Sequence, residues 1–173
     1  IGGNMIALSK VFPTLDCSSC ITTPKMSEAA HSDNIRIMNY TEVTGVQKDG
    51  SGFTVRLLKK PRYVREDICI GCKKCEEVCP VYVKHSFERM TGARKAICIP
   101  FTTAIPQKAV LYPEDCMQCG KCYDACPTNP KSIDYDQEPA EETVEADTVI
   151  LTTGFKLTDN DRKKEYSDGT QRN

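Results

Sequence analysis

A single twelve-residue cysteine pattern occurs twice in this chain. CIGCKKCEEVCP runs from Cys69 to Pro80 and CMQCGKCYDACP runs from Cys116 to Pro127, an offset of 116 − 69 = 47 residues. In both copies the thiols stand at successive offsets of three, three and four residues, and a proline follows the last thiol. The duplication constrains the middle of the chain more than any other feature, because eight of the eleven cysteines are confined to these two short runs.

This spacing is the bacterial ferredoxin pattern for [4Fe–4S] clusters. Three cysteines at three-residue intervals can wrap a loop around one cubane, with permissive residues such as Gly71 and Gly120 between them. The fourth cysteine follows one helical turn later and can reach the other cluster. We therefore predict two clusters with crossed ligation, one held by Cys69, Cys72, Cys75 and Cys126 and the other by Cys116, Cys119, Cys122 and Cys79.

Structural zinc is the main alternative for a cysteine-rich module. Zinc sites usually combine two C-x-x-C pairs in a tetrahedral array. Two complete four-cysteine runs would leave half of the thiols without a role in such a site, so the pattern favours iron and sulfide. Three lysines next to the thiols could raise the cluster potentials or could be ordinary surface residues: Lys73, Lys74 and Lys121.

Three cysteines lie outside the two runs. Cys98 stands in the apolar segment KAICIP and is expected to be a buried, inert thiol. Cys17 and Cys20 form a C-x-x-C pair that suits a redox dithiol, a disulfide or half of a metal site. Pro24 makes a helix after Cys20 unfavourable, which argues against a thioredoxin-like dithiol. We predict that the pair supplies part of a third [4Fe–4S] site, with its other cysteines outside these residues.

Composition excludes several classes of function. The net charge of −1 argues against a nucleic-acid partner, and no apolar run reaches the roughly 18 residues of a membrane span. No signal peptide is visible at the start. Many cysteines without an export signal indicate metal or redox chemistry in the cytoplasm, where a structural disulfide is not expected. The first residue, Ile1, suggests a fragment of a longer protein.

The pattern along the chain predicts an α+β organisation. Residues 35–46 and 53–57 alternate apolar and polar side chains around the turn QKDGSG, which is typical of a hairpin, and a further strand is expected at 143–152. We expect these strands to share one sheet that flanks an inserted cysteine module, with domains at 1–60, 61–133 and 134–173. The entry segment is basic (Arg56, Lys59, Lys60, Arg62, Arg65) and the exit segment is acidic. They could form a docking surface, but we favour neighbouring strands that pair their charges.

Several stretches resemble the A subunit of heterodisulfide reductase. They are IGGNMIALSKVFPTLDCSSCITTPKM, KKPRYVREDICIGCKKCEEVCP, KAICIPFTTAIP and VILTTGF, in that order. The ferredoxin motif is shared by many proteins, whereas DCSSC…PKM and the KKPRYV entry are more particular. The resemblance covers nearly the whole chain.

The resemblance implies a two-cluster ferredoxin-like module inserted into a β-rich piece of a thioredoxin-reductase-like FAD domain. It implies flavin-based electron bifurcation, in which a hydrogenase or formate dehydrogenase subunit supplies electron pairs. One electron goes to the coenzyme M–coenzyme B heterodisulfide, with subunits B and C as partners, and the other reduces a ferredoxin. By the same resemblance, Gly2, Gly3, Thr153 and Gly154 are expected to contact FAD.

One feature differs from a complete flavoprotein of that family. No G-x-G-x-x-G loop is present, so the dinucleotide-binding βαβ unit is missing from these residues. FAD is therefore expected in the complete protein, with this piece contributing only edges of the pocket. The alternatives to a subunit of an oxidoreductase complex are a freestanding ferredoxin-like carrier and a zinc-binding structural module.

Overall fold

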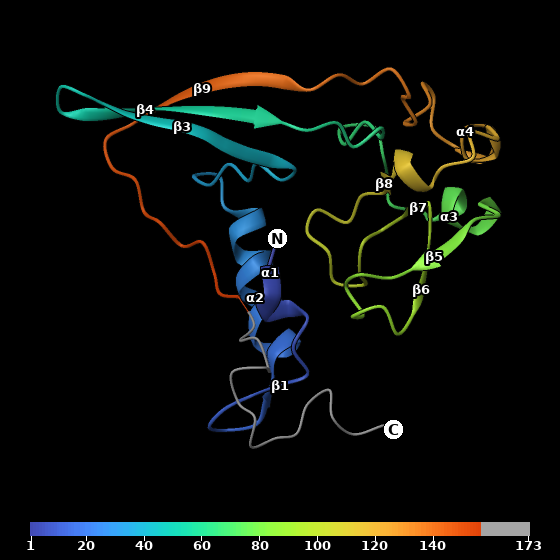
Figure 1. Ribbon diagram of the computed structural model, residues 1–173, viewed down its shortest axis with the longest axis horizontal. Coiled ribbons are helices and arrows are strands. Elements are labelled where there is room, and N and C mark those ends of the chain that lie inside the picture. The colour runs from blue at the N-terminus through green and yellow to red at the C-terminus, as the bar shows by residue number, and fades with distance from the viewer. Residues whose placement is uncertain (157–173) are drawn as a thin grey trace, which may run out of the picture.

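The computed structural model describes residues 1–156, which form an α+β arrangement of three parts (Figure 1). A three-stranded sheet runs along the top of the view, a cysteine-rich module lies to its right, and a helical pair lies below. Within the described residues no helix combines the length and the apolar character that crossing a membrane requires.

The sheet consists of β3 (Thr41–Asp49), β4 (Gly52–Lys59) and β9 (Ala140–Ala146), with β4 in the centre. Both pairings are antiparallel, and Val55 of β4 lies between Val46 of β3 and Val144 of β9. β3 and β4 form the expected hairpin. The predicted sharing of one sheet by strands from both sides of the cysteine module is confirmed.

The predicted ends of two of these strands are wrong. β3 starts at residue 41 rather than 35, and β9 covers 140–146 rather than 143–152. The central strand explains both limits, because its last residue, Lys59, pairs with Thr41 and with Ala140, while Phe53 pairs with Ala146. Ile150 and Leu151, beyond β9, have no strand to pair with, and both are exposed.

The expected pairing of charges between entry and exit segments is also not what the structure shows. The register places Arg56 opposite Thr143 and Lys59 opposite Ala140. Ion pairs of the other basic residues go to acids nearer in the chain: Lys60 to Glu42, Arg62 to Glu66, and Arg65 to Asp67. Backbone register therefore brings the two segments together without matching their charges.

The cysteine module contains two short helices, four short strands and one 3-10 turn. Its elements are α3 (Lys74–Val78), β5 (Tyr82–Lys84), β6 (Ala93–Lys95), β7 (Ile97–Cys98), β8 (Val110–Leu111), η1 (Pro113–Asp115) and α4 (Lys121–Ala125). β5 pairs with β6, and β7 pairs with β8. A small core of aliphatic residues and thiols fills the module, formed by Val64, Ala96, Ile97, Ala109, Leu111, Ile133 and four of the repeat cysteines.

The chain enters and leaves this module at one place. Val64 and Ile133 form an antiparallel bridge, and both are nearly inaccessible to solvent. On either side of it the Arg65 amide donates to the Ser132 carbonyl at 2.6 Å, and the Asp134 amide donates to the Tyr63 carbonyl at 3.0 Å. The entering and leaving segments are thus hydrogen-bonded to each other, as in a module that is inserted into another domain. That the flanking parts form one FAD domain stays a prediction.

The helical pair contains α1 (Gly3–Ile6) and α2 (Ser18–His31), which are joined through the short strands β1 (Lys10–Val11) and β2 (Asp16–Cys17). Ile6 and Met26 are its buried apolar residues. The expectation that no helix would form around Cys20 is wrong. α2 starts before Cys20, since the Cys17 sulfur accepts a hydrogen bond from the Cys20 amide at 3.3 Å, and Pro24 lies inside the helix.

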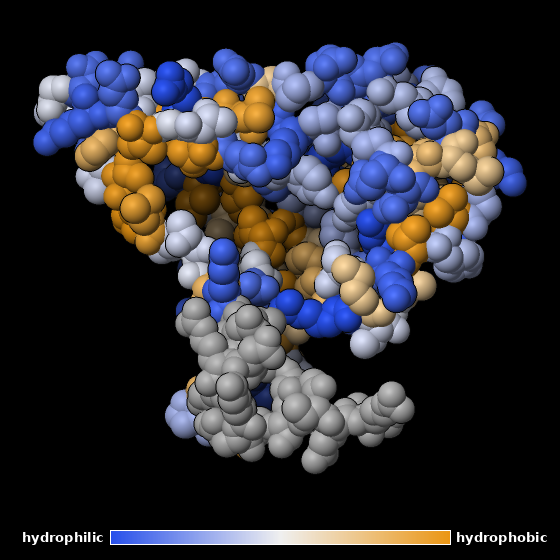
Figure 2. Space-filling view, in the orientation of Figure 1, coloured by the Kyte–Doolittle hydropathy of each residue, from blue (hydrophilic) through white to orange (hydrophobic). Residues whose placement is uncertain are grey.

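Apolar side chains are exposed beside and beneath the sheet. Figure 2 shows them gathered below it, in the hollow between the sheet and the helical pair. Large exposed apolar residues in and after the sheet strands are Val43, Val46, Ile150 and Leu151. Exposed apolar patches of this kind commonly mark surfaces that contact further polypeptide.

Candidate metal centres

Four thiols from both cysteine runs surround the first cavity of the module. They are Cys69, Cys72 and Cys75 of the first run and Cys126, the last cysteine of the second run. Besides the thiols, the cavity is lined by backbone and small or apolar side chains, together with the polar residues Lys73, Thr128 and Ser132.

In the second cavity the two cysteine runs exchange their roles. Cys116, Cys119 and Cys122 of the second run line it together with Cys79, the last cysteine of the first run. Its other lining side chains include Ile97, Leu111 and Tyr135. The structure therefore gathers the eight repeat cysteines into the two groups that the spacing predicts.

Both cysteine loops have the same backbone. The residues two positions after the first cysteine have positive φ, 69° at Gly71 and 55° at Gln118. The residues four positions after it do so too, 62° at Lys73 and 75° at Gly120. Each loop thus has one glycine and one ordinary residue in the left-handed region, where glycine is least strained.

The helices α3 and α4 follow these loops and direct the last cysteine away from them. The two helices contact each other. Cys79 and Cys126 end them with almost identical backbone angles, φ −68° and ψ 123° against φ −66° and ψ 124°. A proline follows each cysteine and favours this extended conformation. The chain turns out of the helix at the cysteine, beside the other loop.

Hydroxyl groups surround the sulfur of Cys126. The Ser132 Oγ and the Thr128 Oγ1 each lie 3.2 Å from the Cys126 Sγ. Burial alone would raise the pKa of this thiol, but the hydrogen bonds from Ser132 and Thr128 outweigh burial and lower the pKa to about 7. A thiolate is the form that ligates metal, so this environment favours ligation.

The second cavity has a different set of donors. The Tyr135 hydroxyl lies 3.2 Å from the Cys122 Sγ, and the Gln118 amide donates to the Cys116 Sγ at 3.3 Å. Burial raises the pKa of Cys122 despite the Tyr135 contact. In the first cavity burial and the neighbouring Cys69 raise the pKa of Cys75 to about 12. Neighbouring thiols cannot all ionise in such sites without a bound cation.

Three lysines bind carbonyl groups of repeat cysteines. The Lys95 ammonium donates to the Cys79 carbonyl at 2.7 Å, Lys131 donates to the Cys126 carbonyl, and Lys108 donates to the Cys69 carbonyl. Sequence reasoning missed these lysines, since they lie outside the repeats, and considered Lys73, Lys74 and Lys121 instead. Of those three, only Lys73 lines a cavity.

The donor chemistry of the two cavities fits an iron–sulfur cubane. Each provides four sulfur donors, the number that a [4Fe–4S] cluster takes from protein. Across residues 1–156 no three His, Cys, Asp or Glu side chains converge as ligands of a single metal ion would. The thiols surround a space instead, and a cubane is a larger group than a single ion.

The remaining cysteines lie apart from these cavities. Cys98 pairs with Val110 in the β7–β8 ladder, is 2% exposed, and lines neither cavity. Burial, followed by the charge of Glu76, raises its pKa to about 11. At the start of α2, hydrogen bonding from Cys20 lowers the pKa of Cys17 and raises that of Cys20.

The four residues expected at a flavin come from two segments that the structure brings together. Asn4, next to Gly3, donates its side-chain amide to the carbonyl of Phe155, next to Gly154, at 2.8 Å. Gly2 precedes α1 with φ 107°, and a Cβ there would approach the Met26 sulfur to 2.8 Å. Close packing against α2 is therefore one reason for a glycine at this position.

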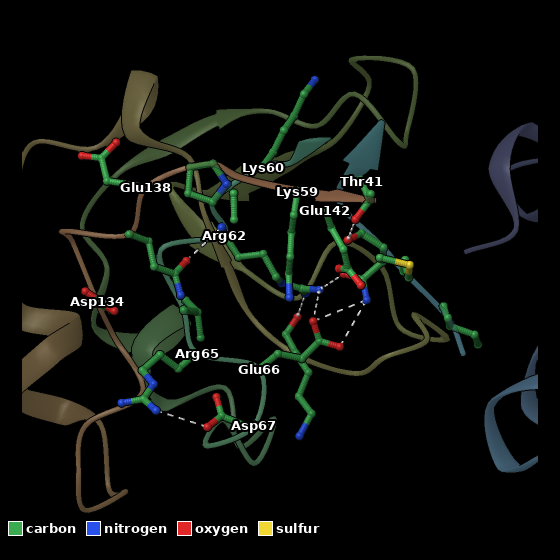
Figure 3. Close-up of a pocket in the computed structure, with 18 of the residues that line it drawn as sticks. Thr41, Lys59, Lys60, Arg62, Arg65, Glu66, Asp67, Asp134, Glu138 and Glu142 are labelled. Atoms are coloured by element: carbon green, nitrogen blue, oxygen red, sulfur yellow. Dashed lines mark hydrogen bonds and ion pairs between the residues drawn. The ribbon is translucent and has the colours of Figure 1, made fainter. Parts of the chain in front are cut away.

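A larger cavity of about 740 Å³ lies where the sheet meets the cysteine module (Figure 3). Charged side chains line it, and three ion pairs join lining residues: Arg36 with Glu142, Arg62 with Glu66, and Arg65 with Asp67. Arg62 is the buried member, 5% exposed, with its guanidinium donating to Asn39 and Glu66 and to the carbonyl of Lys108. It ties the sheet-side segment to the module.

Comparisons with known proteins found a matching domain model and similar proteins. Residues 68–130 match the model of a 4Fe-4S dicluster domain. The chain is 43% identical over 170 residues to the A subunit of the ferredoxin:CoB-CoM heterodisulfide reductase of Methanosarcina mazei. It is 41% identical over 173 residues to the A subunit of the H(2):CoB-CoM heterodisulfide,ferredoxin reductase of Methanothermobacter thermautotrophicus. These matches cover 98% and 100% of this chain but 21% and 26% of the two relatives.

Proposed function

Because this chain is homologous over nearly its whole length to a segment of the A subunit of heterodisulfide reductase, we propose that it conducts single electrons through two [4Fe–4S] clusters in a complex of that type. Cys69, Cys72, Cys75 and Cys126 hold one cluster, and Cys116, Cys119, Cys122 and Cys79 hold the other. When bound, each cubane accepts and returns one electron.

One observation carries the proposal: each cavity is lined by three cysteines of one run and the last cysteine of the other. The two sites then share both helices and cannot form independently. Ile97 and Leu111 lie in the small core and also line the second cavity, so they exclude water on its inner side. Two one-electron sites joined through the contacting helices α3 and α4 suit electron transfer better than storage.

The wider activity is proposed from the homology. The chain would be one part of a flavoprotein that splits electron pairs, sending one electron toward the coenzyme M–coenzyme B heterodisulfide and the other to ferredoxin. The names of the relatives include the heterodisulfide and ferredoxin. We propose as partners subunits B and C, a hydrogenase or formate dehydrogenase subunit, and ferredoxin.

FAD binding belongs to the same proposal. The contact between Asn4 and Phe155 places Gly2, Gly3, Thr153 and Gly154 in two neighbouring segments, which supports a shared edge of a flavin pocket. Exposed apolar residues beside the sheet support a host domain that is larger than the sheet itself.

The crossed ligation is tested with single Cys→Ser variants of the protein purified anaerobically. Iron and acid-labile sulfide should be present at about eight of each per chain, two cubanes' worth. Cys126→Ser and Cys75→Ser should disturb the same reduced-state EPR signal, and Cys79→Ser the other. If Cys126→Ser instead disturbs the signal that Cys122→Ser disturbs, the ligation is not crossed. Zinc in place of iron and sulfide would contradict the function itself.

We also propose that Cys17 and Cys20 supply part of a third [4Fe–4S] site. Both thiols lie at the start of α2, and Cys20 is exposed, so further ligands can approach them. The experiment is anomalous diffraction at the iron edge on a complete assembly. Iron bonded to both sulfurs is expected, and a disulfide or two metal-free thiols would rule the site out.

A further inference from the structure

The two thiol-lined cavities are closely matched in ligands and in burial. Each has two buried thiols, one half-buried thiol and one exposed thiol. The exposed thiols are Cys72 and Cys119, at the same place in the two runs. Neither cavity has an aspartate or glutamate among its lining residues. Differences in cluster potential are then expected from the hydrogen bonds and charges that surround the two cavities.

Positive charge is unequally distributed between the cavities. Lys73 lines the cavity that contains Cys126, and two more ammonium groups bind carbonyls of its cysteines, Lys108 at Cys69 and Lys131 at Cys126. The other cavity has one such group, Lys95 at the Cys79 carbonyl, and no charged residue in its lining.

Hydrogen bonds to sulfur are equal in number in the two cavities. Two hydroxyls, of Ser132 and Thr128, lie at 3.2 Å from the single sulfur of Cys126. In the other cavity one phenol, that of Tyr135, lies at 3.2 Å from the Cys122 sulfur, and the Gln118 amide donates to Cys116. The phenol is the stronger individual donor, but this cavity lacks two of the three cations found beside its counterpart.

Resting on the proposed function, we propose that the cluster held by Cys69, Cys72, Cys75 and Cys126 has the higher reduction potential of the two. Reduction adds one negative charge to a cubane, and nearby cations and hydrogen-bond donors stabilise that charge. A single electron shared by the two clusters is therefore found mainly on the cluster held by Cys126. That cluster is reduced when the cluster beside Tyr135 gives up the electron and is oxidised. Lys73, Lys108 and Lys131 set this order, and the hydroxyls of Ser132 and Thr128 add to it at the Cys126 sulfur.

The experiment is potentiometric titration of the complete, anaerobically purified protein, followed by EPR. Ser132→Ala should lower one midpoint potential, and Tyr135→Phe should lower the other. The midpoint that responds to Ser132→Ala should be the higher of the two in the unaltered protein. Ser132→Thr keeps the hydroxyl and should restore the potential, while Ser51→Ala, in the exposed hairpin turn, should change neither midpoint.

A second set of variants guards against an unstable Ser132→Ala. Thr128→Val and Lys131→Gln should lower the same higher midpoint, because they remove a donor and a cation from the same site. If these variants or Ser132→Ala move the lower midpoint, or leave both unchanged, this inference is wrong while the proposed function stands. If the unaltered protein gives no pair of cubane signals, the proposed function itself fails.

Discussion

The ammonium group of Lys95 donates a hydrogen bond to the carbonyl oxygen of Cys79 at 2.7 Å. Lys131 does the same for the carbonyl of Cys126, the equivalent residue of the second run. Both carbonyls stand at the end of a short helix, where intrahelical partners run out, and a proline without an amide proton follows each. Lysines from outside the repeats therefore bind Cys79 and Cys126, the two cysteines whose thiols line the cavity of the other run.

Replacing Lys95 should weaken the module. Lys95→Met removes a charged donor to a half-buried carbonyl and also removes an ammonium 3.3 Å from the centre of the Tyr82 ring. We expect a loss of about 1.5–3 kcal/mol in the free energy of unfolding, the usual range for a charged hydrogen bond. Denaturant unfolding under anaerobic conditions measures it. Lys48→Met, on an exposed strand position, is the matched control, and equal losses in the two variants would contradict the role of Lys95.

Sequence reasoning identified the eight clustered cysteines because their spacing is local, and their two groups because two-cluster ferredoxins cross the fourth cysteine. A spacing of three, three and four residues sets a loop and one helical turn whatever surrounds them. The lysines on the cysteine carbonyls could not be found in this way. Lys95 ends β6, Lys108 precedes β8, and Lys131 follows the second run, so their convergence depends on how the module folds.

Arg62 should be the most sensitive residue between the sheet and the module. Its buried guanidinium also lies 5.1 Å from the centre of the Tyr40 ring, besides binding Asn39, Glu66 and the Lys108 carbonyl. Arg62→Lys keeps the charge but loses the planar fork. We expect a loss of about 2–4 kcal/mol in unfolding free energy, measured by denaturant titration, because several partners lose their donor.

The matched control for Arg62 is Arg36→Lys. Arg36 pairs with Glu142 at 2.8 Å, but its side chain is 70% exposed. Exposed ion pairs contribute about 0–1 kcal/mol. A loss at Arg62 no larger than the loss at Arg36 would show that the buried guanidinium does not tie the sheet to the module.

The ends of the elements were harder to predict than their existence. Residues 143–152 are apolar enough for a longer strand, yet β9 ends at Ala146 opposite Phe53, near the start of β4. The end of an edge strand depends on the length of the strand it pairs with, and the sequence of the edge strand alone does not contain that length. The prediction that Pro24 would prevent a helix after Cys20 failed for a similar reason, because the helix begins at Ser18 and Pro24 lies inside it.

Cys98 should behave as a structural thiol. Cys98→Ala should leave the iron content unchanged, because Cys98 lines neither cavity. It should cost about 1 kcal/mol of stability through lost packing. Loss of about four irons per chain, one cubane's worth, would instead make it a ligand.

The pKa of Cys98 gives an independent check. Alkylation requires the thiolate, and burial raises this pKa to about 11. Reaction with iodoacetamide should therefore stay slow through about pH 9 and accelerate only toward the raised pKa. Peptide mapping by mass spectrometry follows it, with Cys17, whose pKa is lowered, as the internal comparison in iron-free protein. Equal rates of the two thiols near neutral pH would contradict the burial of Cys98.

Gly71 and Gly120 should respond differently to alanine although both have positive φ, 69° and 75°. Either substitution places a side chain in the left-handed region, at a cost of about 1–2 kcal/mol. At Gly71 the new Cβ would also collide with the carbonyl oxygen of Gln107, whereas at Gly120 no atom outside the adjoining chain lies within 4 Å. Gly71→Ala should therefore lower both the unfolding free energy and the yield of the cluster bound by Cys69, Cys72 and Cys75. Gly120→Ala should show the backbone cost alone and keep both clusters.

Unfolding and EPR of the two variants decide this, and equal damage from both would mean that backbone strain, not the contact with Gln107, explains the glycine at position 71.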